Sequence, residues 1–132
     1  MRDMKSSAQA QQQTQAQSQT ASETSIAESE EQVVQTEFGF ASYYNDAFHG
    51  NPTASGEPYD KDDLTAAHRE YPFGTRIRVT NLENGKSVIV RVNDRGPHTE
   101  DRILDVSGRA AKELELDLAG VAEVQIEMLE SF

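Results

Sequence analysis

The stretch "TRIRVTNLENGKSVIVRVND", residues 75–94, indicates the fold more clearly than any other part of the chain. Aliphatic side chains occupy alternate positions on both sides of its centre: Ile77, Val79, Val88, Val90 and Val92. Such alternation predicts two strands, each with one buried face. Asn84 and Gly85 stand between the two runs and suit the positive-φ turn that joins paired strands. The stretch therefore predicts an antiparallel β-hairpin.

Three more segments have the pattern of short strands. The segment "FGFASYY" at 38–44 is aromatic and alternating, and "RILDVS" at 102–107 follows the hairpin. The segment "GVAEVQIEML" at 120–129 is the last of the series. Its side chains expected to face inward are Val121, Val124 and Ile126.

A short helix is expected before that last strand. Ser107 can cap its N-terminus, and the sequence "GRAAKELEL" follows at 108–116. The apolar side chains on one face of this helix are Ala110, Ala111 and Leu114. Many short strands with one or two short helices predict an all-β fold, specifically a small β-barrel.

Residues 1–37 differ from the rest in composition. They are rich in Gln, Ser, Ala and Thr and contain no aromatic residue. So little apolar surface cannot offset a backbone ordering cost of about 1–2 kcal/mol per residue. We expect a disordered tether at 1–37, with a frayed Ala/Gln-rich helix as the alternative, and one folded domain at 38–130.

Charge and composition limit what the chain can bind. A formal net charge of -11 disfavours nucleic acid and anionic lipid surfaces. Because cysteine is absent, there is no disulfide, thiolate nucleophile or zinc ribbon. No apolar run approaches the roughly 20 residues of a membrane span, and the N-terminus lacks the apolar core of a secretion signal.

Residues that can carry chemistry gather in three segments: "TASGEPYDKDDLTAAH" at 53–68, "NDRGP" at 93–97 and "ILDVS" at 103–107. Their acidic and histidine side chains of interest are Glu57, Asp60, His68, Asp94 and Asp105. The first segment is expected to be a loop that leads into a helix, whereas Asp94 leaves the second hairpin strand. Carboxylates around one groove suit acid catalysis, because burial and neighbouring charge can keep a carboxyl protonated near neutral pH.

Each of these side chains also has an ordinary structural explanation. His68 can be a buried structural histidine, and Asp94 can accept hydrogen bonds from the turn that follows it. Asp105 can cap the helix, and Asp62 and Asp63 can favour a helix N-terminus. A metal site is a further alternative, but the spacing matches neither HExxH nor a calcium loop, so no bound metal is expected.

Seven motifs occur in order between Phe38 and Leu129: "ASYY", "TASGEPYD", "TAAH", "PFGT", "NLENG", "NDRGP" and "ILDVS". In this set and order they resemble the RlpA-like (rare lipoprotein A) family, which includes septal ring lytic transglycosylases. The resemblance implies a six-stranded double-psi β-barrel, here preceded by the disordered segment. It covers essentially all of the expected folded region.

The resemblance also implies an activity. Family members act as endolytic lytic transglycosylases on the glycan strands of peptidoglycan. They cleave the β-1,4 bond between N-acetylmuramic acid and N-acetylglucosamine without adding water and leave 1,6-anhydro ends. The family motifs place functional residues at Glu57, Asp60, His68 and Asp94, and no cofactor is implied.

One carboxyl group can act as both acid and base in this reaction, giving a proton to the leaving oxygen and taking one from the C6 hydroxyl. We expect Asp94 in this role, with Asp60 as the close competitor. Glu57 is expected to tune the proton affinity or stabilise developing charge. His68 is expected to orient a carboxylate or contact sugar hydroxyls.

Contacts to the substrate are expected from aromatic and basic residues. Tyr43, Tyr44 and Phe48 are candidates for stacking on sugar faces, and each is equally a candidate for the core. The family often has Trp where Tyr43 stands. Arg95 is expected to pair with Asp94 or to meet a lactyl carboxylate. The residues expected to have structural roles at the helix start are Asp105 and Ser107.

A non-catalytic binding module is the rival interpretation. Double-psi barrels also occur in expansin-like proteins, which bind or loosen wall polysaccharide without cutting it, and fold alone does not establish an enzyme. The expected partner is peptidoglycan, met by a monomer in the bacterial cell envelope, in the periplasm or at the outer membrane. The resemblance further implies tethering to a membrane through an N-terminal anchor ahead of the residues given.

Overall fold

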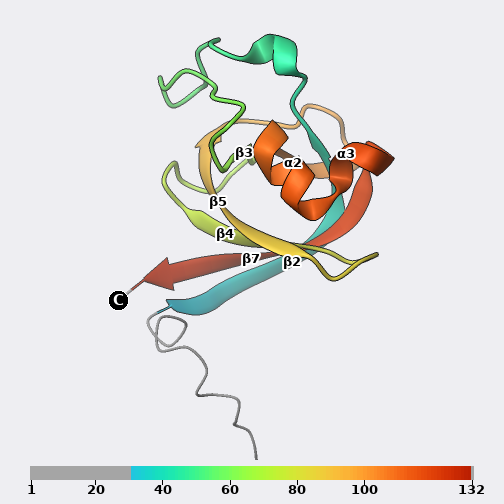
Figure 1. The fold of residues 1–132 in the computed structure, drawn as a ribbon. Coiled ribbons are helices and arrows are strands. Elements are labelled where there is room, and N and C mark those ends of the chain that lie inside the picture. The colour runs from blue at the N-terminus through green and yellow to red at the C-terminus, as the bar shows by residue number, and fades with distance from the viewer. Residues whose placement is uncertain (1–30, 132) are drawn as a thin grey trace, which may run out of the picture. The chain divides into compact units, whose positions relative to one another are not determined.

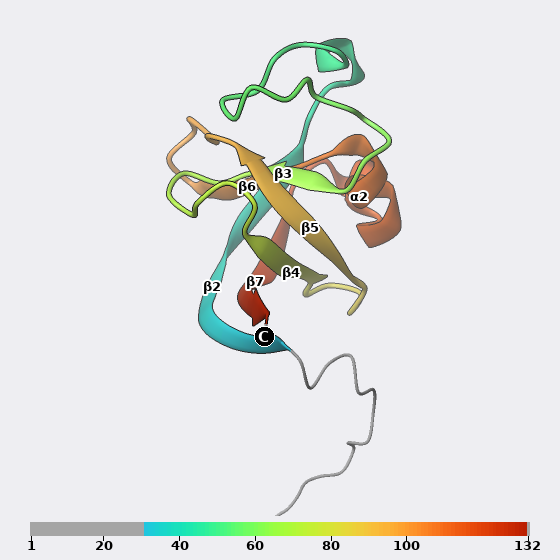
Figure 2. The ribbon, with the colours of Figure 1, turned by 90° about the vertical axis from the view of Figure 1, so that its left-hand side faces the viewer.

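The computed structural model describes residues 31–131, and Figures 1 and 2 show its ribbon. Residues 1–30, most of the expected tether, lie outside the described residues. The strands are β2 (Glu31–Tyr43), β3 (Thr65–Ala67), β4 (Arg76–Asn81), β5 (Ser87–Asp94), β6 (Arg102–Val106) and β7 (Ala122–Ser131). The helical segments are the 3-10 turn η2 (Asp46–Phe48), α2 (Gly108–Leu114) and α3 (Leu116–Ala119).

The six strands form a closed barrel with the neighbour order β2-β6-β3-β5-β4-β7. Strand β2 is parallel to β6, and β3 is parallel to β5. The β3–β6, β4–β5 and β4–β7 pairs are antiparallel. The expected all-β barrel with six strands and short helices is confirmed. Because β3 and β5 are parallel, the residues that end these two strands lie at the same edge of the barrel.

The expected hairpin is present as β4 and β5. Ile77 pairs with Val90 and Val79 with Val88, and all four side chains are buried. Burying such an aliphatic side chain stabilises the fold by about 1.5–3 kcal/mol. The hairpin therefore supplies one wall of the core, as the alternating sequence predicted.

The connection of the hairpin is longer than a two-residue turn, since it spans residues 82–86. Within it only Gly85 has a positive φ, of 78°. The side chain of Asn84 instead donates a hydrogen bond to the carbonyl of Leu114 at 3.1 Å. The Asn-Gly pair therefore anchors the hairpin to the end of α2.

Helix α2 begins where the sequence predicted. The Ser107 hydroxyl accepts a hydrogen bond from the amide of Ala110 at 3.3 Å, which caps the helix. The side chains of Ala110, Ala111 and Leu114 are fully buried against the barrel. This packing fixes the end of β6, which runs directly into the cap.

Three local expectations differ from the structure. Strand β2 begins at Glu31, ahead of the boundary expected at Phe38, because backbone pairing in a sheet does not require apolar side chains. Val121 is 42% exposed and precedes β7, so its inward orientation was wrong, whereas Val124 and Ile126 are buried as expected.

The third difference concerns the segment at 53–68. It leads into strand β3 and not into a helix, and all three residues of β3 are buried. Pairing with β5 on one side and β6 on the other overrides the local helix preference of the Ala pair. Asp62 and Asp63 consequently do not stand at a helix N-terminus. No helix within residues 31–131 has the length and hydropathy needed to cross a membrane.

Candidate active site

A groove of about 350 Å³ lies beside the end of β5, beneath the long connection between β2 and β3. Figure 1 shows this connection looping beyond the barrel at the edge where β3 and β5 end. The residues that line the groove are Tyr44, Phe48, Asn51, Pro52, Thr53, Tyr59 and Asp94. Three of them, Tyr44, Phe48 and Asp94, were candidates from the sequence.

Asp94 is the half-buried carboxylate of the groove and the last residue of β5. Its Oδ1 atom accepts hydrogen bonds from the amides of Ala54 at 2.8 Å and Arg95 at 2.9 Å. Its Oδ2 atom accepts one from the Tyr44 hydroxyl. Because two fixed amides occupy Oδ1, Oδ2 is the oxygen left to exchange a proton with a ligand in the groove.

Tyr44 is held in place from two sides. Its ring stacks on Tyr59, with centroids 4.4 Å apart and planes 13° apart, and meets Phe48 edge-on at 6.2 Å. Burial, and then the hydrogen bond to Asp94, raise the pKa of Tyr44 above its ordinary value. The phenol therefore stays protonated and acts as a donor to Asp94, which is a positioning role more than a sugar-stacking one.

Asp105 lies in the same row of the sheet as Asp94. Ala67 of β3 pairs with Asp94 of β5 on one side and with Asp105 of β6 on the other. Asp105 accepts a hydrogen bond from the hydroxyl of Ser42, which in turn accepts one from Arg102 at 2.8 Å. The expected capping role of Asp105 was wrong, because its carboxylate points across the sheet and not toward α2.

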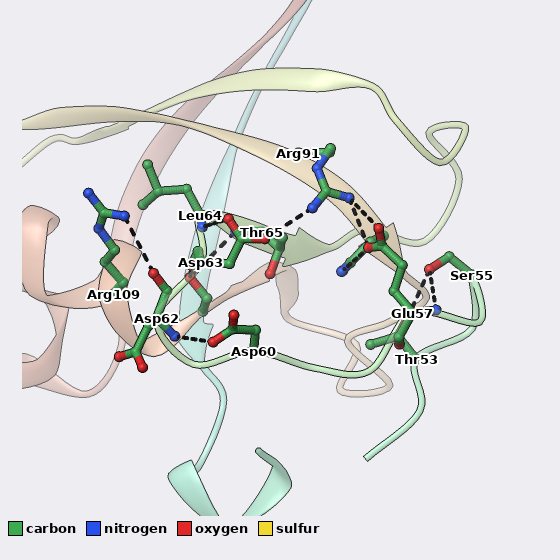
Figure 3. Close-up of polar contacts among 12 residues, drawn as sticks. Thr53, Ser55, Glu57, Asp60, Asp62, Asp63, Leu64, Thr65, Arg91 and Arg109 are labelled. Atoms are coloured by element: carbon green, nitrogen blue, oxygen red, sulfur yellow. Dashed lines mark hydrogen bonds and ion pairs between the residues drawn. The ribbon is translucent and has the colours of Figure 1, made fainter. Parts of the chain in front are cut away.

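The carboxylate of Glu57 does not line the groove and is bound by Arg91 (Figure 3). Its carboxylate accepts hydrogen bonds from Arg91 at 2.8 and 3.1 Å and from Asn93 at 2.9 Å. Arg91 also pairs with Asp63 at 3.1 Å. The contacts to Arg91, and then that to Asn93, lower the pKa of Glu57. Glu57 is therefore an ionised anchor that fastens the β2–β3 connection to β5.

Asp60 is exposed and does not line the groove. Its carboxylate accepts a hydrogen bond from the amide of Asp62 at 2.9 Å, a local turn contact (Figure 3). Asp60 therefore takes part in a local turn and not in the lining of the groove. Across residues 31–131, no three potential protein ligands are grouped as a metal site would require.

His68 follows β3, but its ring does not line the groove. The side chain is only 4% exposed, and Nδ1 accepts hydrogen bonds from the amides of Glu70 and Tyr71, both at 3.0 Å. The ring stacks on that of Tyr71 with centroids 3.7 Å apart. Burial lowers the pKa of His68, so the imidazole is neutral. Only its backbone meets Asp94, whose carbonyl accepts from the His68 amide at 3.2 Å.

The two remaining candidates also point elsewhere. Tyr43 packs against the core, and its hydroxyl donates to the carbonyl of Asp117 at 3.4 Å. The expected pairing of Arg95 with Asp94 was wrong: its guanidinium donates to the Tyr71 carbonyl at 2.8 Å and lies 4.1 Å from the ring centroid of Phe73. Arg95 therefore supports the edge of the barrel.

Sequence reasoning missed Tyr59, which forms the back of the groove. The residue is 2% exposed, and its hydroxyl accepts a hydrogen bond from the amide of Gly108 at 2.9 Å. It also missed Pro52, which forms an isolated β-bridge with Pro58 and so shapes the loop around the groove. The prolines on either side of "TASGE" were the available signal for a rigid loop.

The strand order and the groove together define a double-psi β-barrel with a carboxylate at the mouth of a polar and aromatic cleft. A family model described as "Lytic transglycolase" matches residues 36–126, and the chain belongs to this family.

Curated relatives bear the name that the resemblance implied. The chain is 58% identical over 88 residues to "Probable endolytic peptidoglycan transglycosylase RlpA" of Treponema pallidum, covering 67% of this chain and 28% of the relative. It is 52% identical over 94 residues to "Endolytic peptidoglycan transglycosylase RlpA" of Neisseria meningitidis, covering 71% and 39%. The chain thus spans well under half the length of these relatives.

Solved structures support the fold. The structure of apo-Clavibacter michiganensis expansin matches with a TM-score of 0.57 and 28% identity, over 71% of this chain and 50% of that one. The Streptomyces papain inhibitor matches with a TM-score of 0.59 and 24% identity, over 73% and 96% of the chains. The barrel is therefore shared by an expansin and a papain inhibitor.

Proposed function

We propose that this chain is the catalytic domain of an endolytic lytic transglycosylase that cleaves the glycan strands of peptidoglycan. The observation that carries the proposal is the Asp94 carboxylate, which lines the groove with Oδ1 fixed by two amides and Oδ2 shared with a neutral tyrosine. The names of the relatives support the same reaction.

The chemistry needs one group that gives a proton and then takes one. Protonated Asp94 gives its proton to the O4 leaving group of N-acetylglucosamine as the bond to C1 of N-acetylmuramic acid breaks. The C6 hydroxyl of the muramic acid then attacks C1, and its proton returns to Asp94. A 1,6-anhydro ring closes, no water is consumed, and the carboxyl group is regenerated.

The surrounding residues suit this task. The Tyr44 hydroxyl orients the Asp94 carboxyl, and the two amides fix its plane. Phe48, which is 50% exposed beside Tyr44, offers an apolar face to a sugar ring. Asp105 of β6, which pairs with Ala67 of β3, supplies a second carboxylate. Its negative charge favours the positive character that develops at C1.

The setting of the reaction follows from its substrate. Peptidoglycan lies in the bacterial cell envelope, so we place the domain there, as a monomer tethered through an N-terminal anchor. The sugar rings and N-acetyl groups of the strand carry no charge, so the net charge of -11 leaves the acidic surface compatible with a glycan substrate.

An expansin-like binding module is the second candidate, because the barrel matches an expansin with a TM-score of 0.57. Such a module would need the groove but no acid. The hydrogen bonds around Asp94 favour catalysis, since two amides and a phenol hold a half-buried carboxyl where it can exchange a proton with a ligand in the groove.

The test uses wild-type protein and the variants Asp94→Asn, Asp105→Asn and Asp60→Asn, each incubated with peptidoglycan sacculi. Soluble products are analysed by mass spectrometry. We expect anhydro ends from wild type and Asp60→Asn, and a loss of about 10²–10⁴-fold for Asp94→Asn. Loss in Asp105→Asn with Asp94→Asn active would move the acid to Asp105. Reducing ends would indicate a hydrolase, and bound sacculi without products would indicate the binding module.

A further inference from the structure

Two segments that are remote in sequence lie side by side near the start of β5. They are the β4–β5 connection at 82–86 and the stretch at 115–123, which contains α3. The amide of Leu82 in the first segment donates a hydrogen bond to the carbonyl of Glu123 in the second, at 3.1 Å. The two segments therefore form one surface, and it shares no residue with the groove that holds Asp94.

This surface exposes three aliphatic side chains. Leu118 is 82% exposed, more than any other large apolar side chain among residues 31–131, and Leu82 and Val121 are 44% and 42% exposed. Leu82 lies opposite Glu123, and Val121 precedes Glu123 by two residues, so both face the outer side of the sheet. Leu118 is three residues before Val121, at most about 11 Å along the chain. Leu82, Leu118 and Val121 are called the aliphatic patch below.

The packing of the barrel does not explain why Leu118 is exposed. Leu116, two residues earlier in α3, is fully buried, so the opposite side of this short helix faces solvent. Helix α3 starts at a turn in which Glu115 has a left-handed backbone, with φ 62°, and this conformation costs free energy for a residue with a Cβ atom. An exposed leucine and a strained glutamate thus stand at one place in the fold.

Carboxylates surround the aliphatic patch. The two segments contain four exposed acidic residues, Glu83, Glu115, Asp117 and Glu123, and a single cation, Lys86. Lys86 pairs with Glu115 at 3.8 Å. The other three carboxylates have no ion pair within the described part of the chain. The rim of the patch is therefore negative.

The combination of patch and rim selects the occupant. Leucine and valine offer no hydrogen-bond donor or acceptor to sugar hydroxyls, and the carboxylates repel an anionic lipid surface. A second copy of the chain would bring two sets of like charges into one interface. A helix with leucine-like side chains flanked by lysine or arginine matches both the patch and the rim. We propose that this surface binds a cationic amphipathic segment of a partner protein.

Strand β5 separates the surface from the groove. The connection at 82–86 leads directly into Ser87, the first residue of β5, and Asp94 is the last. The residue steps between them, at about 3.3 Å each, put the two ends of the strand about 23 Å apart. Figure 2 shows β5 crossing the barrel. A bound partner therefore leaves the groove open to substrate, and the inference does not depend on the proposed function.

The test uses the full chain and a synthetic helical peptide of about 14 leucine and lysine residues, with the leucines on one face. The peptide is titrated into the isotope-labelled chain and followed by NMR. We expect the shifts to gather at 82–86 and 115–123. Shifts spread evenly over the rest of the acidic surface would overturn the proposal.

A matched pair of variants tests the aliphatic patch. Leu118→Ser should weaken peptide binding by at least about tenfold, because it removes the most exposed apolar side chain of the surface. Val34→Ser is the control, since that side chain is 49% exposed but belongs to the first half of β2. Equal affinities for the two variants would contradict the proposal.

A second pair tests the rim. Asp117→Asn combined with Glu123→Gln should weaken binding about tenfold and reduce its dependence on salt. Asp101→Asn combined with Glu130→Gln removes two exposed carboxylates elsewhere and should have a much smaller effect. A peptide with glutamate in place of lysine should not bind, and binding as tight as that of the lysine peptide would refute the charge match.

Sedimentation of the chain alone distinguishes the remaining occupant. We expect a monomer in wild type and in Leu118→Ser. A dimer in wild type that Leu118→Ser abolishes would assign the aliphatic patch to a second copy of the chain and overturn the proposal.

Discussion

Asp94 and Asp105 flank Ala67, one from β5 and the other from β6. Both carboxylates raise the pKa of Tyr44, after its burial. A phenol beside two carboxylates holds its proton firmly, so Tyr44 can only donate to Asp94.

The Tyr44 hydroxyl is expected to matter for turnover. Tyr44→Phe keeps the ring stacked on Tyr59 but removes the hydrogen bond to Asp94. We expect kcat for anhydro-product formation to fall about tenfold, with KM little changed. Tyr43→Phe is the matched control, since that hydroxyl meets the Asp117 carbonyl outside the groove. Similar kcat values for both variants would contradict the positioning role.

Arg91 is expected to act through the loop that it holds. It bridges Glu57 and Asp63, so Arg91→Gln should loosen the connection that lines the groove (Figure 3). These groups are partly exposed, and we expect a loss of stability below about 1 kcal/mol. Steady-state kinetics should show KM raised about threefold to tenfold.

The control for this variant is Arg78→Gln, which breaks an ion pair with Glu127 of β7 at 3.2 Å and touches no residue of the connection in that pair. It should leave KM unchanged. A KM effect of equal size in both variants would mean that general surface charge, and not the loop, determines substrate binding.

Stability should decrease in weak acid because of His68. Its folded-state pKa lies below the ordinary value of about 6.5, mainly through burial, while the Glu37 and Glu70 carboxylates oppose the shift. The unfolded chain therefore binds the proton first as pH falls. The stability that the neutral His68 contributes is fully present above about pH 6.5. It is lost progressively as the pH falls toward the folded-state pKa.

Urea unfolding at a series of pH values provides the measurement. His68→Asn keeps a side-chain acceptor and removes the titrating ring, so the step that begins near pH 6.5 should disappear. Glu57, whose pKa is lowered, contributes at more acidic pH and should still be visible in the variant. If the free energy of unfolding of His68→Asn still falls below pH 6.5 as in wild type, the fall is not caused by His68.

Glu115 is expected to limit stability. It joins α2 to α3 with a left-handed backbone, φ 62°, and is the only described non-glycine residue with positive φ. Glu115→Gly should raise the free energy of unfolding by about 0.5–1 kcal/mol, since its ion pair with Lys86, at 3.8 Å, is exposed and weak.

Glu113→Gly is the control for that change, because Glu113 lies within α2. Glycine there should lower stability by about 0.5–1 kcal/mol. Chemical denaturation of both variants compares the two signs directly. A loss of stability in Glu115→Gly would show that the side chain matters more than the backbone strain.

Much of the barrel could be predicted from local pattern, and the hairpin shows why. Ile77, Val79, Val88 and Val90 alternate and pair with one another, so their burial depends on neighbours close in sequence. Strand β3 escaped prediction because its pairing comes from β5 and β6, which lie far along the chain. The residue preferences of a short segment do not reveal pairing with strands that are remote in sequence.

The prediction of the site was incomplete for a similar reason. Motifs identified Asp94, but the direction of each side chain depends on strand parity, which reverses at every residue. Tyr43 therefore packs on the core while its neighbour Tyr44 lines the groove. Glu57 stands apart from the groove because Arg91, a residue without an evident role in the sequence, binds its carboxylate.

The neighbour order also has a consequence for how the protein is made. Strands β2 and β7, the first and last of the described chain, are adjacent in the closed barrel. The parallel β2–β6 pair likewise joins Ser42 to Asp105, across most of the domain. Contacts so remote in sequence make folding slow, in the range of about milliseconds to seconds. The barrel cannot close until β7 has been synthesised, so the nascent domain remains open until its last strand has left the ribosome.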